Sequence, residues 1–359
     1  MGWSISIGRI FGIKFKIHIT FFLLLFFVFM SVLNQHGFHS AVLATLFICA
    51  IFICVLIHEI GHSLIARRFG KEAKSITLLP IGGVATIEEM PEKPAQEIAM
   101  SIVGPLINLA IAAVLYIFVG NWTGIGAPNL SPDSIQTFFA DLIGVNIMLA
   151  IFNLIPAFPM DGGRVLRGIL AMKMDYVRAT TAAVSIGQGL AMLFILFGIF
   201  FNWWFALIGL FLYIGAGSEK QHVIVKSLLH DVPASEVMVR EFRTLAPDEP
   251  LSHALEHFYH GCQEDFPVIG EDGFEGILTR DRILASIHNK GLETQVSEVM
   301  DTNPTSIIPT MSLEDVYKKL LSAHKTAVVV VEKGHVEGIV CLDSISRYFM
   351  IKSAMKTAE

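Results

Sequence analysis

A short motif that could carry metal chemistry lies at residues 58–62, where the chain reads His58-Glu59-Ile60-Gly61-His62. Four residues advance a helix by about 400°, so the two imidazoles would lie on one face, one turn apart. Both ring nitrogens could then reach a single zinc ion. Glu59 would lie beside them, where it could take a proton from a water molecule. The motif therefore predicts a hydrolytic zinc site.

A catalytic zinc site needs a third protein ligand, and Asp161 is the best candidate. It lies in a segment with two prolines, Pro156 and Pro159, which prevent a regular helix. Irregular backbone at membrane depth is tolerated where it lines a protein-walled or watery cavity. The alternative is that Asp161 is a turn carboxylate in the headgroup region. Asp141 is expected near the opposite side of the membrane and is not a candidate.

These residues are embedded in a chain that is too apolar for a soluble enzyme. Apolar residues make up 53% of the 359 residues and charged residues 16%, whereas a soluble domain carries about 25% charge. This composition also excludes a disordered chain and a secreted disulfide scaffold, and the net charge of −6 gives no sign of a nucleic-acid surface. The apolar residues form six runs long enough to cross a bilayer. We place them at 17–33, 41–66, 98–119, 136–156, 181–201 and 203–217.

The basic residues predict the orientation of these runs. They occur before the first run, after every second run and after the last, and the loops near 34–40, 120–135 and 202 contain none. The positive-inside rule then places the N-terminus and the C-terminal region in the cytosol, in a multi-pass protein of the cell membrane. The residues concerned are Arg9, Lys14, Lys16, Arg67, Arg68, Lys71, Lys74, Lys93, Arg164, Arg167, Lys173, Arg178 and Lys220.

The C-terminal region is a duplication with an offset of 62 residues. Residues 235–238 (Ser-Glu-Val-Met) return at 297–300, and residues 275–277 (Glu-Gly-Ile) return at 337–339. Such a fixed offset indicates two copies of one unit. Each copy is predicted to contain a short strand, an amphipathic helix (251–261 or 313–323), two β-rich segments (266–269 and 275–279, or 327–331 and 337–341) and a second helix.

The two motifs together resemble the site-2 protease family of intramembrane zinc metalloproteases. The resemblance covers roughly residues 8–220 and rests on H-E-I-G-H at 58–62 and on N-L-I-P-A-F-P-M-D-G-G-R at 153–164, with support from 79–83 and 104–108. It implies one zinc ion per chain, bound by His58, His62 and Asp161, and a catalytic Glu59. It further implies that Asn153 positions the substrate or stabilises the oxyanion. Without the resemblance, Gly104, Pro105 and Asn108 would indicate only a helix kink and contact.

The duplicated region resembles a pair of cystathionine-β-synthase (CBS) modules, which many proteins use to bind adenine nucleotides and to associate as dimers. The nucleotide signature of such modules is incomplete here. The first copy keeps Thr279 but has Arg282 where an aspartate is expected, and the second copy loses both residues. Asp281 and Asp343 could instead cap the helices that follow. A nucleotide at this pair is therefore an open expectation.

Taken together, the sequence predicts an α-helical membrane protein. It has six transmembrane helices, a small membrane-associated β-hairpin near 75–88, and a cytosolic α/β CBS pair. The predicted limits are 1–220 for the protease domain, 221–233 for a linker, and 234–290 and 296–352 for the CBS domains. The predicted function is cleavage of transmembrane protein substrates within or near the lipid bilayer, modulated by the cytosolic CBS pair, with no nucleic acid involved. The alternatives are a CBS-gated metal-ion transporter or channel and a non-catalytic membrane sensor.

Overall fold

The computed structural model describes residues 4–10, 12–71, 73–80, 82–87, 93–123, 134–260, 263–271, 273–323, 325–333 and 335–358. Most of the predicted outer loop near 120–135, together with Ile81 and Glu88 of the predicted hairpin, lies outside these residues. The chain divides into two compact units, Met1–Gln221 and His222–Glu359. Each unit is described separately.

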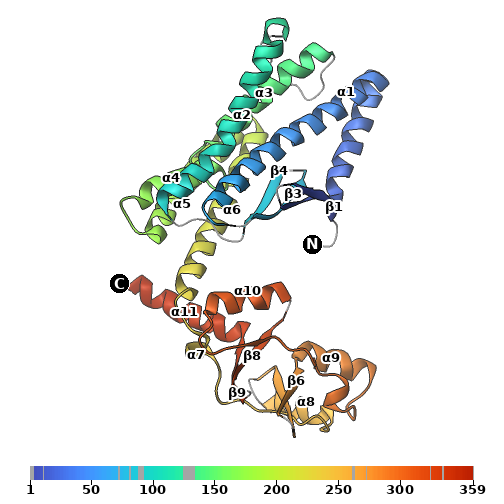
Figure 1. Cartoon of the computed structure of the whole chain (residues 1–359), viewed down its shortest axis with the longest axis vertical. Helices are drawn as coiled ribbons and strands as arrows, with labels where there is room; N and C mark the ends of the chain where they lie inside the picture. Colours follow the sequence, from blue (N-terminus) through green and yellow to red (C-terminus); the bar gives the residue numbers. More distant parts are fainter. Residues whose placement is uncertain are drawn as a thin grey trace. The chain divides into compact units, whose positions relative to one another are not determined.

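The first unit is mainly helical, and within the described residues four helices are long and apolar enough to cross a membrane. These are α1, the segment Pro94–Val119 of α2, α3 and α5. Helix α2 continues through Pro105 without interruption and packs against α1, α3 and α4 (Figure 1). The helices are α1 (Ile19–Arg68), α2 (Pro94–Thr123), α3 (Ile135–Asn153), α4 (Asp161–Ala171), α5 (Tyr176–Phe200) and α6 (Trp203–Leu229).

Helix α1 contains both of the first two predicted runs. Its 50 residues would measure about 75 Å if straight, more than twice the hydrocarbon core. The helix breaks at Gly37, whose φ of 83° and ψ of 177° are unfavourable for any residue with a side chain. The two limbs fold back on each other (Figure 1). The ring centroids of Phe21 and Phe52, one from each limb, lie 4.6 Å apart. The break at Gly37 thus provides the reversal of chain direction for which a loop was expected near 34–40.

A four-stranded sheet accompanies the helices, in the order β1-β2-β3-β4. Its strands are β1 (Ser4–Ile10), β2 (Ile13–His18), β3 (Ala73–Leu79) and β4 (Gly82–Ile87). The expected hairpin is β3–β4, paired so that Thr77 faces Val84. Strands β1 and β2, which form a second antiparallel hairpin, were not predicted from the sequence. Strand β2 runs parallel to β3, so α1 is the long crossover between the two hairpins.

The segment between α3 and α4 is irregular, as the prolines predicted. Helix α3 ends at Asn153, three residues before the predicted end of that run, and a series of turns leads to Asp161 at the start of α4. Pro156 and Pro159 lie in these turns, where they have no helical hydrogen bond to disrupt. Ala157 and Phe158 are fully buried there and pack against α5 and α6. The irregular segment is therefore anchored to α5 and α6 by buried apolar contacts.

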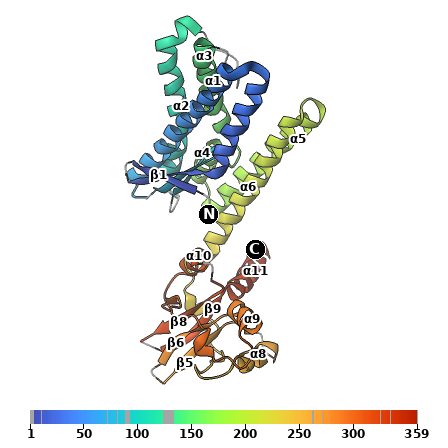
Figure 2. The same ribbon diagram turned by 90° about the vertical axis from the view of Figure 1, so that its right-hand side faces the viewer.

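The second unit contains the duplication, and Figure 2 shows its strands flanked by helices. The predicted limits of its amphipathic helices and β-rich segments agree with the observed ones to within three residues. The short strand predicted at the start of each copy is β7 in the second copy, whereas in the described part of the first copy it is reduced to an isolated bridge between Leu245 and Val268. Asp281 and Asp343 lie in the first turns of α9 and α11, and the residue that caps α9 is Thr279, so the expected cap at Asp281 is wrong. The elements are α7 (Ala234–Val237), α8 (Leu251–His260), β5 (Phe266–Gly270), β6 (Gly273–Leu278), α9 (Arg280–Asn289), a 3₁₀ turn (Val296–Glu298), β7 (Ser306–Ile307), α10 (Leu313–Ala323), β8 (Ala327–Glu332), β9 (His335–Cys341) and α11 (Leu342–Ala358).

Candidate metal centre

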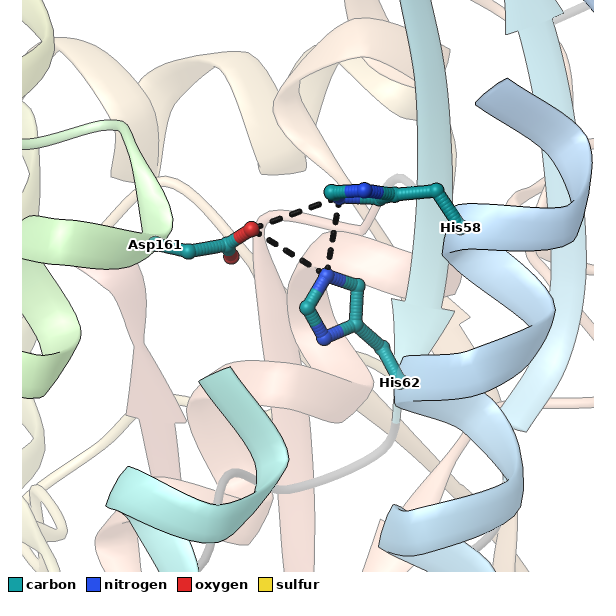
Figure 3. Close-up of side chains that lie close together, drawn as sticks. All are labelled: His58, His62 and Asp161. Carbon is teal, nitrogen blue, oxygen red and sulfur yellow. Dashed lines mark hydrogen bonds and ion pairs between the residues drawn. The ribbon is translucent and has the colours of Figure 1, made fainter. Parts of the chain in front are cut away.

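Two histidines of α1 and one aspartate of α4 converge on a single point (Figure 3). The Nε2 atoms of His58 and His62 lie 3.0 Å apart. Asp161 Oδ2 lies 3.3 Å from the first and 3.2 Å from the second. All three residues are buried. The structure therefore brings together the three predicted ligands, although 99 positions separate His62 from Asp161 in the chain.

The hydrogen bonds of the imidazoles show which ring atoms face this point. His58 Nδ1 donates to Asn108 Oδ1 at 2.6 Å, and His62 Nδ1 donates to the Met100 carbonyl at 2.7 Å. Both acceptors lack a proton to give, so both Nδ1 atoms carry hydrogen. In the neutral rings, the two Nε2 atoms are then lone-pair acceptors directed at each other and at a carboxylate. Three buried acceptors facing one another form a set that could hold a metal ion between them.

The spacing of these acceptors fits zinc. Zinc bound at about 2.05 Å to ligands in tetrahedral geometry separates any two of them by about 3.3 Å. The observed separations of 3.0, 3.2 and 3.3 Å are close to that value. Two imidazoles and a carboxylate are also a donor set that catalytic zinc sites use, and a fourth position would remain for water or substrate.

Helix α2 closes one side of the centre at Gly104. A Cβ atom placed on this residue would lie 2.6 Å from His58 Nε2 and still closer to His62 Nε2, so only hydrogen fits here. The same helix supplies the Met100 carbonyl and Asn108 to the two rings. Residues 104–108, for which a simple helix contact was the alternative, thus lie directly against both histidines.

The predicted base, Glu59, lies between the histidines in sequence and is partly buried. Its side chain passes close to strand β4. A Cβ atom placed on Gly83 would come within 2.7 Å of Glu59 Cγ. A bulkier residue at position 83 would displace the carboxylate. The sheet and the candidate base are therefore in direct contact.

Asn153, the other predicted catalytic residue, is less closely tied to the centre. It is the last residue of α3, and its Nδ2 donates to the Leu149 carbonyl of the same helix at 3.0 Å. Within the described residues, no hydrogen bond joins Asn153 to the three converging side chains. Its role stays a prediction.

A buried charge cluster anchors the helix that begins with Asp161. The guanidinium of Arg167 is 1% exposed and donates to Glu97 of α2 at 2.7 Å and to Glu219 of α6 at 2.6 Å. Its plane also lies about 5 Å from the ring centroids of Phe158 and Tyr176. One arginine therefore holds α4 to the helix that contacts both histidines.

The sequence analysis missed several of these supporting residues. Asn146 is not among the site residues predicted from the sequence, and in the structure it bonds to Asn108. Arg167 was interpreted only as a topological marker. The sequence signal that could have identified these residues is a polar side chain within an apolar run. Burying such a side chain in the membrane costs free energy unless it has a partner. The sequence did not show which partner.

Comparison with known proteins agrees with this geometry. The family model "Peptidase family M50" matches residues 46–126 and 119–196, and the CBS domain model matches 234–289 and 296–351. Zinc metalloprotease MJ0392 of Methanocaldococcus jannaschii is 35% identical over 98% of this chain and 97% of its own length. Stage IV sporulation protein FB of Bacillus subtilis is 27% identical over 62% of this chain and 76% of its own.

Among solved structures, the site-2 protease from Methanocaldococcus jannaschii is 36% identical and covers 61% of this chain and 95% of its own, with a TM-score of 0.45. The chain belongs to peptidase family M50, the site-2 proteases, and carries two CBS domains. It is a membrane protein and a zinc metalloprotease. The comparisons do not favour the alternative expectation of a CBS-gated metal-ion transporter.

Proposed function

We propose that this protease cleaves peptide bonds of transmembrane proteins at the centre formed by His58, His62 and Asp161. The observation that carries the proposal is the convergence of three buried acceptors at the spacing that zinc requires. Within an apolar helical unit, such a cluster is costly unless it serves a site. The three residues are the proposed zinc ligands.

The proposed roles of the remaining residues follow from their positions. When bound, zinc would polarise the scissile carbonyl and make water acidic enough to react near neutral pH. Glu59 takes a proton from the attacking water and passes it to the leaving nitrogen of the peptide. Asn153 positions the substrate or donates to the oxygen that gains negative charge.

Strand β4 is the proposed docking edge for the substrate. A transmembrane helix hides its carbonyls in hydrogen bonds, so the scissile segment must become extended before attack. Within the described sheet β4 pairs on one side only, and its Gly83 touches Glu59. An extended segment added to that edge would lie beside the base. Unchanged cleavage after Gly83→Val would contradict this docking mode.

Removal of the metal tests the proposed reaction. The purified chain, incorporated into vesicles with a transmembrane substrate, is expected to lose cleavage on treatment with a zinc chelator and to regain it when zinc is restored. Asp161→Asn is expected to weaken zinc retention by at least tenfold, because a neutral amide replaces an anionic ligand. Cleavage that persists in metal-depleted Asp161→Asn protein would exclude this centre as the site of hydrolysis.

The membrane arrangement proposed here has six spans, with both limbs of α1 crossing and both termini in the cytosol of a cell-membrane protein. The support is the distribution of Lys and Arg, which lie on alternate sides of the apolar runs. The break at Gly37 allows two crossings within one helix. Labelling of single cysteines placed near residues 36 and 71 by an impermeant reagent on intact cells tests this. Only the first position should react.

A nucleotide at the CBS pair is a separate proposal. A cavity of about 940 Å³ lies in the second unit, and its lining includes Arg243, Arg280 and Arg347 together with Thr326 and Asp343. Arginines are suited to phosphate groups and the remaining polar groups to ribose. Arg282, which replaces the expected aspartate, instead donates to the carbonyls of residues 299 and 300.

Calorimetry of the full chain with ATP, ADP and AMP tests this cavity. Binding is expected to be lost in Arg280→Glu and kept in Lys319→Glu, a charge-matched change on an exposed residue of α10. Absence of heat with all three nucleotides would contradict the proposal.

Light scattering of the same samples tests the proposed association of the chain through its CBS pair. A monomer under all conditions would contradict that association.

A further inference from the structure

The orientations of the two metal-facing histidines are fixed by different kinds of hydrogen-bond partner. His62 Nδ1 donates to the Met100 carbonyl, a backbone atom that can only accept, so the direction of this hydrogen bond is unambiguous. His58 Nδ1 instead meets the side-chain amide of Asn108 at 2.6 Å. An amide has an accepting end and a donating end, and it would serve His58 correctly in only one of its two orientations.

The orientation of Asn108 is set by a second amide. Asn108 Nδ2 donates to Asn146 Oδ1 of α3 at 3.2 Å. Asn146 Nδ2 in turn donates to the Leu142 carbonyl at 2.9 Å, and it also lies 3.4 Å from Cys54 Sγ. Asn108 and Asn146 are at most 1% exposed, so water does not compete for these groups.

These hydrogen bonds form a directional relay that begins at a backbone carbonyl. The Leu142 carbonyl can only accept, so it takes the nitrogen end of Asn146 and turns the oxygen end toward Asn108. That oxygen takes the nitrogen end of Asn108, whose own oxygen then faces His58 Nδ1. The proton of His58 is thereby held on Nδ1, and Nε2 keeps its lone pair toward Asp161 and His62.

We propose that Asn146 is a positioning residue of the protease, which acts through Asn108 to hold the tautomer and ring orientation of His58. Within the described residues, its hydrogen-bond partners are Asn108, the Leu142 carbonyl and Cys54, and none of them is a candidate ligand. Loss of the partner that directly orients a metal ligand, here Asn108, typically changes metal affinity by about 10- to 100-fold. Reversal of the Asn108 amide would have the effect of that loss. This inference rests on the proposed metal site.

The test measures zinc affinity by competition with a chromophoric chelator, in the full chain in detergent. Asn146→Leu leaves Asn108 free to reverse, so its zinc affinity is expected to fall about 10- to 100-fold. Cys54→Ala removes the sulfur contact of Asn146 and some packing against Phe47 and Leu142, but it leaves the amide relay in place, so it is expected to bind zinc like the unchanged chain. Thermal unfolding of the metal-free proteins shows whether each variant is folded.

A second background separates orientation from packing. Asn108→Asp presents an acceptor to His58 Nδ1 from either oxygen, so it no longer needs Asn146 for its direction. Adding Asn146→Leu to this background is therefore expected to change zinc affinity by less than about twofold. Asn146→Leu that binds zinc normally in the original background, or that loses zinc equally in both, overturns the relay. Failure of the unchanged chain to bind zinc would instead overturn the metal site itself.

Discussion

Glu59→Gln is expected to lower substrate cleavage by about 10²- to 10⁴-fold, the range that loss of a general base produces. Glutamine keeps the size of the side chain where it passes Gly83, but it cannot accept a proton from water. Because Glu59 is not one of the three converging side chains, zinc content should not change. Cleavage is measured with a transmembrane substrate in vesicles, and zinc by elemental analysis of the same samples.

The matched control for this change is Glu256→Gln, which alters an exposed glutamate of α8 and should leave cleavage intact. If Glu59→Gln cleaves at the normal rate, Glu59 is not the base. If zinc is lost together with activity, Glu59 supports the metal rather than the proton transfer. Ion flux through the vesicles that disappears with the same substitution would favour transport over hydrolysis.

Arg167→Met is expected to destabilise the first unit by about 3–5 kcal/mol, because it leaves the carboxylates of Glu97 and Glu219 without their buried counter-charge. Methionine retains much of the apolar contact with the rings of Phe158 and Tyr176. Stability is measured by chemical unfolding in detergent micelles, followed by circular dichroism. Zinc retention should also decrease, since α4 carries Asp161 on its first turn.

Two further variants show whether the charge is responsible. Arg178→Met removes an arginine whose side chain is 85% exposed and is expected to change stability by less than about 1 kcal/mol. Adding Glu97→Gln to Arg167→Met removes one of the uncompensated charges and should recover part of the loss. Equal destabilisation by Arg167→Met and Arg178→Met would mean that the buried cluster contributes little.

The parts of the site that follow a local rule were predictable from sequence. The spacing of His58 and His62 places them on one face of a helix whatever surrounds them. Pro156 and Pro159 predict an irregular segment before Asp161. The convergence of these two segments was inferred from their expected depth in the membrane, and the structure places their side chains together. In the second unit, the 62-residue repeat located helices and strands well, because each copy supports the prediction for the other.

The parts that depend on distant partners were not predictable. Asn108 and Asn146 are 38 positions apart, and nothing in either run specifies that their amides meet. Strand β2 alternates apolar and polar residues from Ile13 to His18, a local strand signal that the prediction overlooked. Its pairing with β3, however, depends on residues that follow the whole of α1. The side chain of Arg167 was expected to be exposed to the cytosol, because nothing in the sequence around a single arginine shows that it is buried. In each case the stabilising interaction is long-range.

The parallel pairing of β2 with β3 has a consequence for shortened forms of the protein. Loss of the first eighteen residues would remove β1 and β2 and expose the other edge of β3. On the docking mode proposed above, a substrate segment could then pair with the free edge of either β3 or β4, whereas in the whole sheet the edge at β4, whose Gly83 lies against Glu59, is the proposed docking edge. On that proposal, substrate bound along β3 would compete with substrate bound along β4, although every residue of the catalytic centre would still be present.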